Sequence, residues 1–198
     1  MHVISGPVTL GLSCHPQAPS RAIQGIDAVV GSEADGMFTL SYVIKGDLSR
    51  LRIPEDGTSR RAHALWAHTC LEAFVMAGNG PGCRELNLLP SGEWALFAFR
   101  SYREGGEVVP APAPHIVVRR TANRLELDAT ICHDFLPQGS PLRLGLSAVV
   151  EDAAGGLSYW ALRHPPGKPD FHHTDAFAFQ LVLPRMHDVN DSPGRVRP

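Results

Sequence analysis

The sequence predicts an all-β protein, a sandwich or a barrel of short strands. Three observations favour this fold: short apolar runs, strict alternation of apolar and polar residues within many of them, and frequent chain breakers between them. The chain has 198 residues, of which 19 are glycine and 17 are proline, and these breakers occur along its whole length. A chain of this length can form one domain and bury roughly 70% of its unfolded surface.

Strands are expected wherever an apolar run lies between turn formers. In chain order they are Val8–Leu12, Ile23–Val30, Phe38–Lys45, His68–Met76, Arg84–Pro90, Glu93–Arg100, His115–Arg120, Arg124–Ile131, Leu142–Glu151, Tyr159–Arg163 and Ala176–Leu183. The segment Arg60–Trp66 predicts one short helical turn, and the proline-rich segment Val109–Pro114 predicts a connector at a sheet edge. We expect residues 1–186 to form a single domain and residues 187–198 to form a flexible tail.

The two runs Arg84–Pro90 and Glu93–Arg100 predict a β-hairpin. Ser91 and Gly92 stand between them, and a Ser-Gly pair indicates a two-residue loop, which would place Leu89 opposite Trp94. In that register the apolar face carries Leu86, Leu88, Ala95, Phe97 and Phe99, and the other face carries Glu85, Asn87, Trp94 and Arg100. The first face is a core face, and the second is a candidate platform for a ligand.

Composition limits the classes of partner. The net charge is −2, and acidic and basic residues are interspersed. The sequence therefore shows no cluster of basic residues of the kind that binds nucleic acid or an anionic membrane. The first residues lack the basic and apolar regions of a signal peptide, and no apolar run approaches a membrane span, so we expect a cytoplasmic protein. The four cysteines form no C-x-x-C pair, and Cys70 and Cys83 are expected to be buried free thiols, with a disulfide between them as the alternative.

The segment Arg163–Thr174, RHPPGKPDFHHT, predicts a long loop between two strands. Long ordered loops in compact β domains often carry function. We expect this loop to cover one end of a site, with Asp170 and His172 shaping its rim.

Several motifs resemble those of the DOMON-like domains, which are related to the family 9 carbohydrate-binding modules. They are LW-x-x-T-C-x-E-x-F at Leu65–Phe74, E-x-N-x-x-P-S-G-x-W at Glu85–Trp94, F-x-x-Y-R-x-G at Phe99–Gly105, and further matches at Gly145–Glu151, Ser158–Leu162 and Gly167–His172. The resemblance covers about residues 38–183. It implies a two-sheet antiparallel immunoglobulin-like β-sandwich with an open concave face, in a family whose members bind sugars or haem and are mostly not catalytic.

A sugar site needs an aromatic plate and planar polar groups that each form two hydrogen bonds. Trp94 is the candidate plate, with Trp66 and Trp160 as candidates for a second one. Glu72, Glu85, Asn87 and Arg100 are the candidate readers of hydroxyl groups. We therefore expect a non-catalytic module that binds a carbohydrate or a sugar-bearing small molecule. A homodimer formed through an exposed sheet edge is a further possibility.

Each candidate also has a structural interpretation. The Glu–Arg pair could be a salt bridge between strands, Trp94 could cap the hairpin, and Trp160 could belong to the core. The loop at Asp170 could simply bind its own backbone.

Three other functions stay open. A haem could take Met76 and one of His68, His164, His172 or His173 as ligands. A metal ion could bind His173 and Asp175, although two ligands do not make a site. Glu72 and Glu85 could form the carboxyl pair of a glycoside hydrolase.

Overall fold

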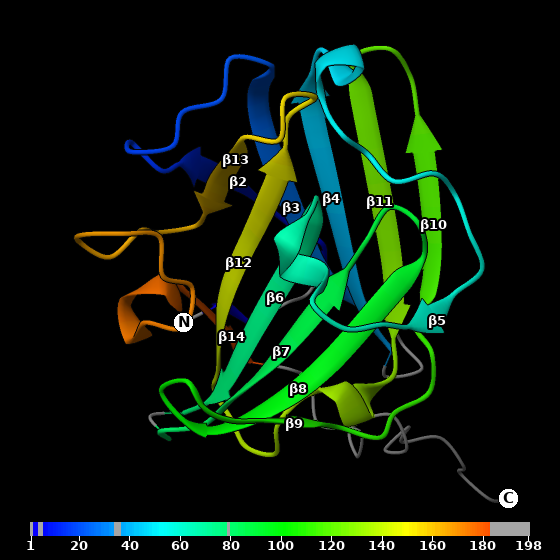
Figure 1. Ribbon diagram of the computed structural model, residues 1–198. Coiled ribbons are helices and arrows are strands. Elements are labelled where there is room, and N and C mark those ends of the chain that lie inside the picture. Colours follow the sequence, from blue (N-terminus) through cyan, green and yellow to red (C-terminus); the bar gives the residue numbers. More distant parts are fainter. Residues whose placement is uncertain (1, 4–5, 34–36, 79, 183–198) are drawn as a thin grey trace, which may run out of the picture.

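The computed structural model describes residues 2–3, 6–33, 37–78 and 80–182 and confirms an all-β protein (Figure 1). Its strands are β1 (His2–Val3), β2 (Val8–Cys14), β3 (Ile23–Ser32), β4 (Phe38–Gly46), β5 (Arg60–Arg61), β6 (Cys70–Ala77), β7 (Cys83–Leu88), β8 (Glu93–Ser101), β9 (Glu104–Val108), β10 (His115–Arg120), β11 (Arg124–Ile131), β12 (Leu142–Glu151), β13 (Leu157–Ala161) and β14 (Phe179–Val182). Four single 3-10 turns accompany them: η1 (Leu48–Arg50), η2 (Leu65–Ala67), η3 (His133–Phe135) and η4 (Thr174–Ala176). Leu183 and the expected tail 187–198 lie outside the described residues.

The strands form one curled, mixed sheet. Their order is β10-β11-β4-β3-β2-β13-β12-β6-β7-β8-β5, with β9 beside β8 and β14 beside both β12 and β1. The β2–β13 junction is short, pairing Trp160 with Cys14 and Ala161 with Ser13. At that junction the sheet curls, so that β3, β4 and β11 lie behind β12, β6 and β7 (Figure 1). The expected pair of separate immunoglobulin-like sheets is therefore not confirmed.

The core lies between the two halves of the curled sheet. Alternate residues of β4 and β11 point inward, and Leu40, Ile44, Leu125 and Leu127 are fully buried. They belong to one apolar cluster with residues of β6, β7, β8 and β12 from the other half. Because side chains alternate across a strand, the same strands have a second face that points away from this core.

The turn between β7 and β8 fixes which side chains lie on that second face. The Leu89 amide donates to Glu93 O over 2.9 Å, so the loop is Pro90-Ser91-Gly92, one residue longer than the sequence predicted. Gly92 has φ +88°, the left-handed conformation that closes a three-residue hairpin. The strand register consequently shifts by one, and Trp94 lies opposite Leu88 instead of Leu89.

This shift places Trp94 in the core. Its side chain is 2% exposed and packs against Phe135, and the Arg61 guanidinium lies 4.0 Å from its ring centroid. The expectation that Trp94 shares a face with Glu85 and Asn87 was wrong, because a shift of one residue moves a strand's side chains to the opposite face. Trp94 does not cap the hairpin either.

The other sequence predictions have mixed outcomes. Every expected strand is present, but β1, β5 and β9 were missed because two of them are two residues long and β9 is mostly exposed and glycine-rich. The helical turn begins at Leu65 rather than at Arg60. The cysteines are free, with Cys70 and Cys83 buried at opposite ends of the β6–β7 pair. None of the helical turns in the described chain has the length or apolar character to cross a membrane.

The two tryptophans Trp94 and Trp66 should differ sharply in their effect on stability. Trp94→Ala should lower the free energy of unfolding by about 3–5 kcal/mol, because it empties a large site in the core. Trp66→Ala should lower it by about 1 kcal/mol or less, because that side chain is 49% exposed. Urea unfolding followed by circular dichroism measures both, and equal losses would contradict the placement of Trp94.

Candidate functional site

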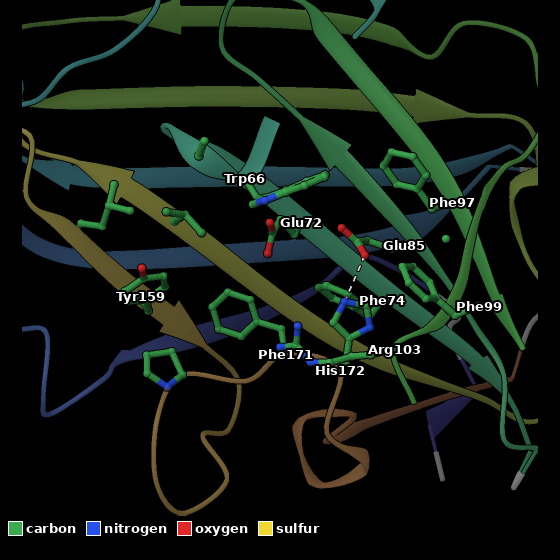
Figure 2. A pocket seen from close by; sticks show the side chains of 15 residues that line it. Trp66, Glu72, Phe74, Glu85, Phe97, Phe99, Arg103, Tyr159, Phe171 and His172 are labelled. Carbon is green, nitrogen blue, oxygen red and sulfur yellow. Dashed lines mark ion pairs between the residues drawn. The ribbon is translucent and has the colours of Figure 1, made fainter. Parts of the chain in front are cut away.

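The second face of β6, β7, β8, β12 and β13 is itself covered, which is unusual for one layer of a curled sheet. Every residue of β6 from Cys70 to Met76 is buried, whichever face it lies on. The covering segments are η2 and the long loop from Arg163 to Phe177. Between them and the strands lies a cavity of about 610 Å³, within the usual range for small-molecule sites (Figure 2).

Two carboxyl groups lie on the floor of this cavity. Glu72 comes from β6 and Glu85 from β7, and they are diagonal neighbours because Glu72 pairs with Asn87 and Phe74 with Glu85. Glu85 Oε1 accepts a hydrogen bond from Asn87 Nδ2 over 2.7 Å, and Glu72 Oε2 accepts one from Ser147 Oγ over 3.1 Å. Asn87 lies fully buried beside Glu85 on the same sheet face and positions its carboxyl group.

Burial changes the protonation of Glu72. Burial, and secondarily the nearby Glu85 charge, raises the pKa of Glu72 from 4.5 to about 8. Glu72 is therefore mostly protonated at neutral pH and can donate a hydrogen bond as well as accept one. Burial and the charge of Glu85 also raise the pKa of Cys83 to about 11, so this thiol stays neutral.

His172 projects from the long loop onto Glu85. Its Nε2 atom lies 3.3 Å from Glu85 Oε2, the contact drawn as a dashed line in Figure 2. The imidazole ring packs edge-on between two phenylalanine rings. Its centroid lies 5.0 Å from that of Phe74 and 4.6 Å from that of Phe99. The long loop is thereby attached to the pocket floor.

Asp170 attaches the same loop to the turn between β8 and β9. Its carboxylate accepts hydrogen bonds from Tyr102 Oη over 2.6 Å and from Arg103 over 2.9 Å. Burial alone would raise the pKa of Asp170, but these hydrogen bonds and the Arg103 charge outweigh it and lower the pKa. Asp170 Oδ1 also accepts from the His172 amide over 3.2 Å, which confirms that the loop binds its own backbone.

Aromatic rings form the walls. They are Trp66, Phe74, Phe97, Phe99, Tyr159 and Phe171. Trp66 is held at the mouth by η2, next to Phe97 at a centroid distance of 6.2 Å. The chain enters η2 through Ala64, whose left-handed backbone (φ 55°) is costly for a residue with a Cβ atom.

The structure brings together part of the residue set expected from the sequence. Trp66, Glu72, Glu85 and His172 line the cavity. Asn87 supports the floor and Asp170 supports the loop, as described above.

Three of the expected residues lie elsewhere. Trp94 is in the core, and so is Trp160, whose Nε1 donates to Ser158 Oγ over 3.2 Å. Arg100 is exposed and pairs with Glu104 at 3.5 Å rather than with Glu85, because the same one-residue register shift places it on the face opposite Glu85.

Sequence reasoning missed most of the aromatic walls. Phe97 and Phe99 were assigned to the core, and the correct hairpin register would have placed them beside Glu85. The signal was Pro90, a residue favoured at the second position of the turn that a three-residue hairpin loop contains. Phe171 and Tyr159 carried no comparable local signal.

The residues present do not fit a haem with axial Met and His ligands. Among the described lining residues His172 is the sole histidine, and its Nε2 already faces Glu85. Met76 packs against Phe74, Cys83 and Phe177 instead of lining the cavity. His173 caps the turn η4 by accepting a hydrogen bond from the Asp175 amide, and the described residues contain no group of three or more side chains placed to hold a metal ion.

Comparisons with known proteins identify the fold. No protein-family model and no curated protein sequence matches the chain. A candidate carbohydrate-binding protein from Bacteroides uniformis superposes with a TM-score of 0.63 over 90% of this chain and 86% of its own, at 13% identity. A family 9 carbohydrate-binding module from Caldicellulosiruptor kristjanssonii, solved with cellotriose, superposes with a TM-score of 0.54 over 96% of this chain and 89% of its own, at 8% identity.

A family 9 carbohydrate-binding module from the same organism, solved with glucose, also superposes with a TM-score of 0.54 at 8% identity, over 87% of this chain and 83% of its own. The chain has the fold of a family 9 carbohydrate-binding module. At such low identity the likeness concerns the fold alone, and the resemblance to DOMON-like domains remains a prediction.

The raised pKa of Glu72 should make stability fall as pH rises. Between pH 4.5 and about 8 the folded protein holds a proton at Glu72 that the unfolded chain releases, so the free energy of unfolding should decrease by about 1.4 kcal/mol per pH unit from this group. Glu72→Gln should remove that slope. Urea unfolding at pH 5 and pH 8.5 checks this, and the idea fails if the variant and the natural protein lose stability in parallel.

Proposed function

We propose that the protein binds a carbohydrate, without catalysis, in the cavity between the second sheet face and the Arg163–Phe177 loop. The observation that carries the proposal is the arrangement of a half-exposed Trp66 ring above two carboxyl groups, inside an aromatic enclosure. The apolar C–H face of a sugar can pack on an aromatic ring while its hydroxyl groups bind the floor. The sugar complexes of the family 9 module, which has the same fold, support the same class of ligand.

The floor suits hydroxyl groups because they both donate and accept hydrogen bonds. Protonated Glu72 can donate to a sugar oxygen and Glu85 can accept from a sugar hydroxyl, so both directions are available within one site. Asn87, His172 and Ser147 already hold the two carboxyl groups in place. A site positioned in advance in this way loses less conformational entropy when it binds its ligand.

Trp66 should contribute strongly to affinity. Titration calorimetry with glucose and with cellotriose should detect binding, and Trp66→Ala should weaken it about tenfold, or 1.4 kcal/mol, because the sugar loses its apolar plate. His63→Ala, an exposed change in the same segment, should leave the affinity unaltered. Equal affinity of Trp66→Ala and the natural protein, or no binding of glucose, cellotriose or an amino sugar, would overturn the proposal.

The same samples separate binding from hydrolysis. Glu72 and Glu85 form the carboxyl pair that a glycosidase requires, but both Glu85 oxygens are already in contact with Asn87 and His172. We expect cellotriose to be recovered intact after the titration. Glucose released in a manner that depends on Glu72 and Glu85 would instead identify a hydrolase.

The Asp170 anchor should matter for binding more than for folding. Asp170→Ala removes the acceptor for Tyr102 and Arg103, so the loop carrying Phe171 and His172 should loosen and sugar affinity should fall about fivefold, roughly 1 kcal/mol. Asp152→Ala is the matched control, because Asp152 also caps a turn but does not line the cavity. Affinity and limited proteolysis of the loop provide the readouts, and the two variants should not behave alike.

A further inference from the structure

The cavity has more acidic groups than basic partners available for them. Glu72 and Glu85 lie on its floor, and Arg103 and His172 are the basic residues of its lining. Arg103 is paired with Asp170 at 2.9 Å, and His172 is directed at Glu85. None of the ion pairs formed within the described residues includes Glu72, whose hydrogen-bond donor is the neutral hydroxyl of Ser147.

A buried carboxyl group without a cationic partner is uncommon, because burial disfavours its charged form. At Glu72 the effect is compounded by the neighbouring Glu85 charge. A cation placed between the two would remove this repulsion and would allow Glu72 to ionise. The missing partner can therefore be supplied by a ligand.

The walls favour the same kind of ligand. A neutral sugar needs one or two aromatic plates, whereas this cavity is lined by six aromatic residues contributed by η2, β6, β8, β13 and the long loop. The face of an aromatic ring attracts a cation, and enclosures of several rings are a known means of recognising ammonium groups. The rings that surround Glu72 and Glu85 (Figure 2) and the two carboxyl groups both stabilise positive charge at the centre of the cavity.

We propose that the natural ligand carries a positive charge, as an amino sugar does, and that its ammonium group lies between Glu72 and Glu85 within the aromatic walls. This inference depends on the proposed function and narrows its ligand class.

Ligand binding should then be coupled to loss of a proton from Glu72. The titratable and charged groups around Glu72 are Glu85 on β7, Cys70 on β6, Tyr42 on β4, Tyr159 on β13, and His172 and Arg103 from the loops. The pKa values of Tyr42 and Cys70 are raised well above their usual range, chiefly by burial, so both groups stay neutral near pH 7. Because Glu72 has a pKa of about 8 in the free protein, affinity for a cation should rise with pH between 6 and 8.

Calorimetry with glucosamine, glucose and N-acetylglucosamine at pH 7 tests the charge requirement. Glucosamine should bind at least about tenfold more tightly than the two neutral sugars. Glu72→Gln and Glu85→Gln should each abolish the preference, whereas Glu126→Gln, a carboxylate on the distant strand β11, should preserve it. Glucose binding as tightly as glucosamine would overturn the inference and leave the carbohydrate function standing.

Choline serves as a probe whose charge does not change with pH. Its binding at pH 7, measured in two buffers of different ionisation enthalpy, should release up to about one proton, and Glu72→Gln should release none. Binding of choline without any of the sugars would support the cationic class and overturn the carbohydrate function. Binding of none of the four compounds would overturn both.

Discussion

The site depends on the register of one hairpin. Gly92 closes a three-residue loop, and that loop determines that Trp94 lies opposite Leu88 and Glu85 opposite Phe97. With a loop of two residues the same sequence would present Trp94 to the outer face and send Phe97 into the core. The chemical character of both faces of the sheet is thus set by a single left-handed backbone position.

Burial on both faces gives the site its chemistry. The inner face of β6 packs against the other half of the sheet, and the outer face is covered by η2 and the long loop. Water is therefore largely kept from Glu72, which is what raises its pKa and strengthens any electrostatic interaction with a guest. An exposed sheet face with the same side chains would hold two ordinary ionised carboxylates.

Much of the fold could be predicted because it depends on local patterns. Alternation in Arg124–Ile131 and Leu142–Glu151 gave both strand bounds correctly. Glu72, Glu85 and Asn87 were found because they interrupt otherwise apolar strands with polar groups. Trp66 and His172 were found because they stand in a motif and in a long loop, respectively.

The failures came from non-local geometry. Trp94 and Arg100 were both misplaced because the face on which they lie depends on the length of the hairpin loop, which alternation within a strand cannot reveal. Tyr159 and Phe171 were missed because only the pairing of β13 with β12 and the path of the long loop bring them beside β6. The continuous strand order, with β2 joined to β13 by two pairs, likewise follows from long-range pairing and not from any local signal.

The cavity takes some of its residues from strands and others from the long loop, and this affects how such a site can change during evolution. Glu72, Glu85 and Asn87 sit on strands whose other residues form the core, so any change of backbone there disturbs the whole domain. Phe171 and His172 lie on a loop that is held to the sheet by side-chain contacts, at Asp170 and at His172, and that contributes no strand to the core. Selectivity for different ligands can thus evolve through substitutions in the loop, while the residues of the cavity floor stay the same.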